Sequence, residues 1–169
     1  SGLVAFALNG LDRWILAEHS PLADVAEFAI AAKFALATVL LLQPFGMWWS
    51  PRRFTVLSED NGAQKVAQFS AMGGALAILV ATLVALISPT LIRYLLPASY
   101  SVAGEYAVAL VVIMLLKELV ELFNIGCFNG KTTNSQFIIN LLAALIGIAS
   151  MHLLTPHYQV WGIIFSLLI

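Results

Sequence analysis

The sequence is poor in charged residues and in cysteine. Only 10% of its 169 residues are charged, whereas an ordinary soluble domain carries about a quarter. The basic residues form no patch with interleaved aromatic side chains, which argues against a nucleic-acid partner. The single cysteine, Cys127, excludes an intrachain disulfide. The sequence also has no nucleophile elbow, phosphate loop or metal-ligand cluster, so we expect no enzyme activity, no metal and no cofactor.

The sequence is rich in hydrophobic residues. They make up 61% of the chain, and the mean hydropathy is +0.94. This composition predicts an all-α, polytopic transmembrane bundle of about six helices. The expected helices are residues 2–17, 22–49, 66–88, 103–128, 135–154 and 158–169. Because the chain opens and closes inside apolar segments, and the last is too short to cross a bilayer, we expect an internal piece of a longer protein.

Basic residues are unevenly distributed between the expected loops. The loops at 50–65 and 129–134 contain Arg52, Arg53, Lys65 and Lys131, whereas the remaining loops contain only Arg93. Cytoplasmic loops of membrane proteins are enriched in Lys and Arg, so these two loops are predicted to be cytoplasmic.

Several charges fall at the depth of the hydrocarbon. Lys33 lies eleven residues after Leu22, about 16 Å along a helix and close to the bilayer midplane. Lys117, Glu118 and Glu121 interrupt the helix expected at 103–128, and Asn124 shares a face with Lys117 and Glu121. Charges at this depth are rare and by default indicate function. The alternative for Lys117 and Glu121 is that they only neutralise each other within one helix.

The first expected helix contains the adjacent charges Asp12 and Arg13. One interpretation is that each meets a partner or water inside the bundle. The other is that both lie among lipid headgroups, which Trp14 favours, because Trp prefers the interface.

Two further patterns concern packing. Pro44 and Gly46 predict a kink that serves either as a hinge or only as a packing feature. Within residues 66–88, small residues share one face and predict close helix packing: Ser70, Gly74, Ala77, Ala81, Ala85 and Ser88.

Short motifs along the chain resemble those of bacterial polysaccharide flippases. The segments are Asn9-Gly10-Leu11-Asp12-Arg13-Trp14, Ala31-Ala32-Lys33, Gln43-Pro44-Phe45, Leu95-Leu96-Pro97-Ala98-Ser99-Tyr100 and Gly130-Lys131-Thr132. These flippases of O-antigen and exopolysaccharide belong to the multidrug/oligosaccharidyl-lipid/polysaccharide flippase superfamily. Leu96-Pro97 departs from the family pattern, since many members have Gly there.

The resemblance implies a MATE-like fold of two six-helix lobes, with this chain as most of the second lobe and the first lobe missing. It further implies translocation of a polyprenyl-pyrophosphate-linked oligosaccharide across the bacterial inner membrane by alternating access. In this interpretation Arg13, Lys33 and Lys117 contact the pyrophosphate or oligosaccharide. Asp12, Glu118, Glu121 and Asn124 then balance charge or couple ions, and membrane lipids surround the bundle.

Other functions remain open from the sequence. A multidrug or organic-cation antiporter of the same superfamily is the first alternative, and a lipid II flippase is the second. A ligase or polymerase acting on lipid-linked sugars would need larger periplasmic loops than these.

Overall fold

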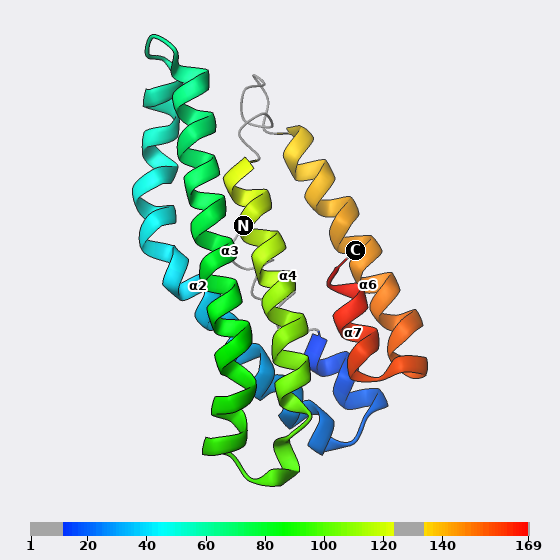
Figure 1. Ribbon diagram of the computed structural model, residues 1–169. Coiled ribbons are helices and arrows are strands. Elements are labelled where there is room, and N and C mark those ends of the chain that lie inside the picture. Colours follow the sequence, from blue (N-terminus) through cyan, green and yellow to red (C-terminus); the bar gives the residue numbers. More distant parts are fainter. Residues whose placement is uncertain (1–11, 124–133, 169) are drawn as a thin grey trace.

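The computed structural model describes residues 12–123 and 134–168, and all regular structure in this part is helical. Residues 12–19 are helical and lead into the named helices, of which α2, α4 and α7 run upward and α3 and α6 downward in Figure 1. These are α2 (Leu22–Leu57), α3 (Gly62–Leu95), the short 3₁₀ helix η1 (Ala98–Tyr100), α4 (Ala103–Phe123), α6 (Asn134–Tyr158) and α7 (Val160–Ser166). The all-α prediction is confirmed for this part of the chain.

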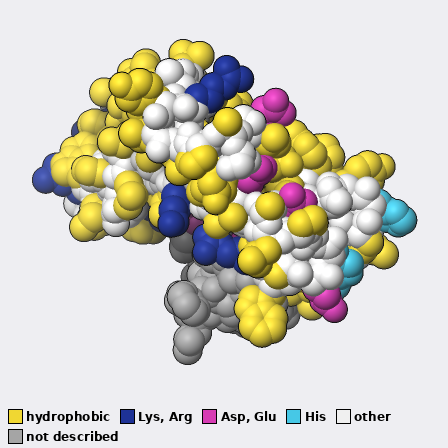
Figure 2. Space-filling model, turned by 90° about the horizontal axis from the view of Figure 1, so that it is seen from below, with side chains coloured by type: hydrophobic (Ala, Val, Ile, Leu, Met, Phe, Trp, Pro, Cys, Tyr) yellow, Lys and Arg dark blue, Asp and Glu magenta, His cyan; other side chains and the backbone are white. Residues whose placement is uncertain are grey.

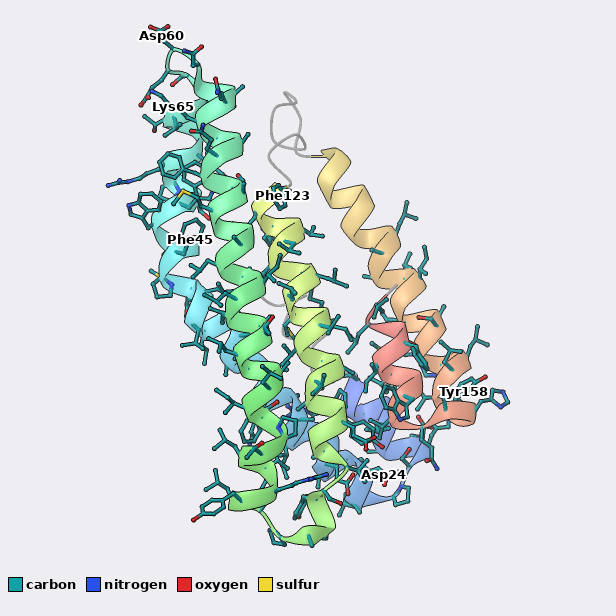
Figure 3. All side chains as sticks on the ribbon, viewed as in Figure 1. Asp24, Phe45, Asp60, Lys65, Phe123 and Tyr158 are labelled. Carbon is teal, nitrogen blue, oxygen red and sulfur yellow. The ribbon has the colours of Figure 1, made fainter. Side chains whose placement is uncertain are left out.

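Helices α2 and α3 are longer than the sequence pattern predicted. α2 continues beyond residue 49, through Pro51, to Leu57, and α3 already begins at Gly62, so most of the predicted 50–65 loop is helical. The turn between them is tight: Asn61 is left-handed with φ 57°, and a Cβ at Gly62 would collide with the carbonyl oxygens of Val56 and Leu57. Asp60 and Lys65 therefore lie at the tip of a helical hairpin (Figure 3).

Both helices are long and apolar enough to cross a bilayer. Their most apolar windows have mean hydropathies of 2.0 and 2.5. At about 1.5 Å per residue, 36 and 34 residues extend about 54 and 51 Å, well beyond a hydrocarbon core of about 30 Å.

Small residues bring α3 close to its neighbours. The predicted face is largely buried, as the accessibilities of Ser70, Gly74, Ala77, Ala81 and Ser88 show. Near the other end of α3, Pro89 lies 3.3 Å from the position that a Cβ of Gly104 would occupy. The predicted packing face is thus confirmed, and α2, α3 and α4 form one closely packed unit.

The upper part of α2 is held by aromatic packing. The helix bends just before Phe45, as expected after Pro44, and the Phe45 ring lies against Gly73 of α3 (Figure 3). Trp49 packs against Phe69 with ring centroids 5.1 Å apart and the ring planes tilted, and it is only 2% exposed. The Trp49 ring therefore faces α3.

Arg53 is also buried, at 8% exposure, although its sequence context predicted a loop residue. Its Nη1 donates a hydrogen bond of 3.3 Å to the backbone carbonyl oxygen of Glu121. That oxygen belongs to the last described turn of α4. Arg53 thereby links the upper ends of α2 and α4.

Helices α6 and α7 form a second unit that packs mainly on itself (Figure 1). α6 continues through Pro156 to Tyr158, beyond the predicted end at residue 154, and Gln159 alone separates it from α7. Gly162 allows the two backbones to approach, since a Cβ there would lie 2.6 Å from the Leu154 carbonyl oxygen. Ile163 and Ile164 of α7 join the core that contains Leu16 and Leu110.

Candidate functional site

A cavity of about 270 Å³ opens between the helix at residues 12–19, α2, α4 and the end of α7. Its polar lining consists of Asp12, Arg13, Lys33 and Lys117. The apolar lining consists of Phe28, Ala32, Leu36, Leu110, Met114 and Leu167. Seen from the end at which α3 and α4 are joined, the surface is mainly hydrophobic, and Lys and Arg side chains gather where it is hollowed (Figure 2).

Helical periodicity explains which side chains α2 and α4 contribute to the cavity lining. Phe28, Ala32 and Leu36 are spaced four residues apart, and Lys33 lies beside them on the same side of α2. On α4, Leu110, Met114 and Lys117 are spaced i, i+4 and i+7, which also places them on one side of the helix. Each helix therefore presents one cation in an otherwise apolar stripe.

The two lysines lie at similar depths. α2 and α4 both start at the lower end of the bundle and run upward (Figure 1). Lys33 lies about 16 Å and Lys117 about 21 Å along these helices, at 1.5 Å per residue from Leu22 and Ala103. The two lysines therefore lie at comparable distances from the lower ends of their helices.

Among the described residues, Asp12 is the one carboxylate that lines this cavity. Its Oδ1 accepts a 2.7 Å hydrogen bond from the backbone N–H of Arg13. The carboxylate is also attracted electrostatically by the charges of Arg13 and Lys117. Three basic side chains and one carboxylate leave the lining with a net charge of about +2 near neutral pH.

The other predicted site residues lie elsewhere. Glu118 and Glu121 are not among the residues that line the cavity, and they repel each other electrostatically. The described residues contain one side-chain ion pair, Lys65 with Glu59 at 2.7 Å, so Lys117 and Glu121 do not form the direct pair that was the alternative for them. Asn124 lies outside the described residues.

The kink residues form no part of the cavity lining. Pro44 lies inside the continuous helix α2, and a Cβ at Gly46 would meet no atom within 4 Å. The kink is present, and its role as a hinge stays a prediction. In the part of the chain that the structure describes, no group of three His, Cys, Asp or Glu side chains is placed to hold a metal.

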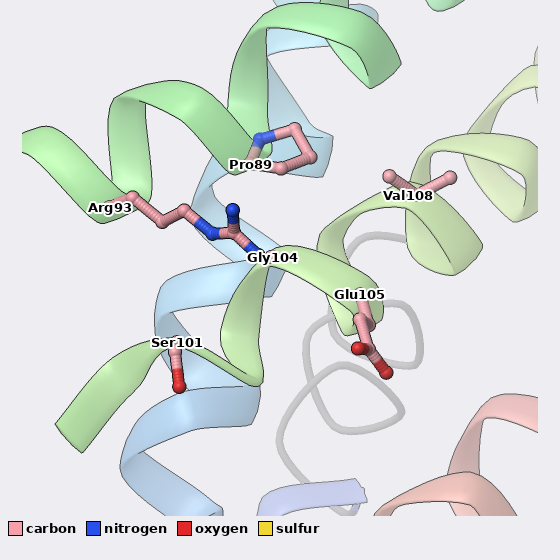
Figure 4. Close-up of a pocket in the computed structure, with 6 residues that line it drawn as sticks. All are labelled: Pro89, Arg93, Ser101, Gly104, Glu105 and Val108. Atoms are coloured by element: carbon pink, nitrogen blue, oxygen red, sulfur yellow. The ribbon is translucent and has the colours of Figure 1, made fainter. Parts of the chain in front are cut away.

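A smaller pocket of about 110 Å³ lies where α3 crosses the start of α4. Arg93 extends across it toward Gly104, while Glu105 points away (Figure 4). Of the described residues that line this pocket, Arg93 is the only basic one. The larger cavity, with three, is therefore the candidate site.

Sequence reasoning named all four polar residues of the cavity but missed its apolar lining. The four-residue spacing from Phe28 through Ala32 to Leu36 was a usable signal, because it follows the face beside Lys33. Leu167 could not have been found in this way, since its position depends on the fold of α7. Comparisons of the chain with family models, curated proteins and solved structures found no match.

Proposed function

We propose that this chain is the second lobe of a two-lobe, MATE-like transporter in the bacterial inner membrane. Its substrate is a polyprenyl-pyrophosphate-linked oligosaccharide used for surface polysaccharide, which it flips by alternating access. The observation that carries the proposal is the convergence of Arg13, Lys33 and Lys117 on one cavity between apolar helices. The motif resemblance described above supports the same assignment.

Energetics favour an anionic ligand. A basic side chain at the bilayer centre costs about 3 kcal/mol on insertion scales, so three would be retained only with compensation. Asp12 supplies one negative charge, and about +2 remains. A pyrophosphate diester carries one negative charge on each phosphate, so it would neutralise the cavity. Arg and Lys also supply the charge-assisted hydrogen bonds that phosphate oxygens accept.

The apolar surroundings suit a lipid-linked substrate. Within the cavity, Leu36, Leu110 and Met114 offer surface for a polyprenyl chain. On the outside, α2 and α3 expose large apolar side chains such as Leu41, Leu79 and Leu86, as expected for helices in contact with membrane lipids. A first lobe of the same polypeptide would close the cavity from the opposite side.

An antiporter of organic cations is the competing function. A site for cations should contain more carboxylates than amines, whereas this lining contains three basic side chains and one carboxylate. The charge balance therefore favours the flippase. It does not distinguish an oligosaccharide carrier from lipid II, since both carry pyrophosphate.

The test uses the full-length protein in a Gram-negative strain that lacks its own O-antigen flippase. The protein should restore surface polysaccharide, and Lys33→Ala should abolish the restoration at equal abundance. Lys65→Ala is the matched control, because Lys65 is exposed at the hairpin and paired with Glu59.

Unchanged polysaccharide in Lys33→Ala would refute the role of Lys33. If the wild type restores nothing, drug resistance is measured in the same cells, and a gain would favour the antiporter. A strain depleted of its lipid II flippase tests the third function.

A further inference from the structure

Asp12 occupies an unusual position for an acidic residue. It shares the cavity with three cations, is attracted by Arg13 and Lys117, and makes its hydrogen bond to a backbone N–H. Neither Arg13 nor Lys117 forms a direct ion pair with it, since Lys65–Glu59 is the one such pair among the described residues. The carboxylate is therefore held near these cations while their charged groups stay available to a ligand.

A carboxylate in this place has a predictable effect on an anionic ligand. Phosphate oxygens that approach Lys117 and Arg13 enter the field of a negative charge already attracted to the same two groups. Because the lining around these charges is largely apolar while the basic side chains are exposed, the repulsion is only partly screened. The result is weaker binding than three cations alone would give.

Weaker binding is an advantage to a carrier. A transporter must release its substrate on the far side of the membrane, and affinity is governed mostly by the rate of dissociation. We propose that Asp12 is an internal competitor of the substrate phosphates: in the empty cavity it offsets part of the positive charge of Lys117 and Arg13, and it lowers the affinity for the anion. This inference rests on the proposed function, because it assigns to Asp12 a role in the binding and release of that substrate.

The competitor role differs from a purely structural one. In a purely structural role, Asp12 would act only through the 2.7 Å hydrogen bond that its Oδ1 accepts from the backbone N–H of Arg13. Loss of that interaction alone would lower stability and leave anion affinity unchanged or reduced. If Asp12 competes with the phosphates, removing its charge should instead raise the affinity for the anion.

The experiment measures binding of inorganic pyrophosphate to the full-length protein in detergent by titration calorimetry. Asp12→Asn keeps the shape of the side chain and removes its charge, so affinity should rise by about fivefold, as for a partly solvated charge interaction. Asp12→Glu keeps the charge and should retain wild-type affinity. Glu18→Gln is the matched control, since it removes one negative charge from the same helix outside the cavity lining.

A double-mutant cycle tests whether Asp12 acts on affinity through Lys117. In a Lys117→Gln background, Asp12→Asn should raise affinity by less than it does in the wild type. If Asp12→Asn is too unstable to purify, Asp12→Ser takes its place in the same cycle.

The outcomes separate the two proposals. Saturable wild-type binding that is lost in Lys33→Ala, with no gain in Asp12→Asn, overturns only the competitor role of Asp12. An equal gain in Glu18→Gln also overturns it, because the effect would then be one of net charge. Absence of saturable binding to the wild type overturns the anion cavity and, with it, this inference.

Discussion

The adjacent glycines Gly73 and Gly74 allow a sharp test of how α2, α3 and α4 pack. A Cβ added at Gly73 would lie 2.8 Å from Cζ of Phe45 and 3.2 Å from Cδ2 of Leu122. The Phe45 ring also packs near Trp48 with centroids 5.9 Å apart, so making room for the new Cβ would disturb this contact as well. A Cβ at Gly74 would meet Leu119 and Phe123 at 3.5 Å, an ordinary contact distance.

These distances predict opposite effects of the same substitution. Overpacking should lower the unfolding free energy of Gly73→Ala by about 1–3 kcal/mol. The better helix propensity of Ala should offset about 0.5–1 kcal/mol of that loss. Gly74→Ala should only become more stable, because Ala has a better helix propensity than Gly and its Cβ meets no clash. Gly46→Ala is a second control, because its Cβ would meet no atom within 4 Å. The two neighbours should thus differ by about 2 kcal/mol in unfolding free energy.

Thermal unfolding in detergent, followed by tryptophan fluorescence, measures the difference. For a protein of this size, about 2 kcal/mol corresponds to a gap of roughly 4–8 °C between the two midpoints. The order expected is Gly73→Ala below the wild type, with Gly74→Ala and Gly46→Ala at or above it. Equal midpoints for Gly73→Ala and Gly74→Ala would refute the seating of Phe45 on Gly73.

Three further substitutions test local features by the same unfolding assay. Gly62→Ala should lower stability by about 1–3 kcal/mol, because its Cβ would meet backbone carbonyl oxygens that cannot move aside; wild-type stability would contradict the tight hairpin. Gln159→Gly should raise stability by about 1 kcal/mol, since φ 51° and ψ −124° suit glycine; a lower midpoint would contradict this strain. Glu59→Gln should change stability by less than about 0.5 kcal/mol, because its pair with Lys65 is half exposed; a larger loss would show that the pair matters.

Much of the fold follows from local sequence patterns. The start of α2 at Leu22 follows Pro21, and the start of α4 at Ala103 was expected at that residue. The small-residue face of α3 was recognisable because helical periodicity acts within one segment. Lys33 and Lys117 were singled out because charge inside an apolar run is conspicuous without knowledge of the tertiary structure.

Other features depended on partners distant in sequence. Trp48-Trp49-Ser50-Pro51-Arg52-Arg53 has the composition of a helix end, yet α2 continues through it. There Trp49 packs on Phe69 and Arg53 bonds to Glu121, contacts that composition does not encode. On α4 the cavity lining ends at Lys117, so Glu121, one turn further on, lies outside it although both residues share a face.

The division of the bundle into two packing units has a consequence for its biogenesis. The mutual contacts of α2, α3 and α4, and the bond from Arg53 to the end of α4, are made between residues 22 and 123. A chain synthesised from its N-terminus can therefore complete this three-helix unit before α6 leaves the ribosome, as domains that fold during synthesis do. Helices α6 and α7 can pair with each other and dock afterwards through the few contacts of α7 with α2 and α4. The cavity, which needs Leu167, is finished last.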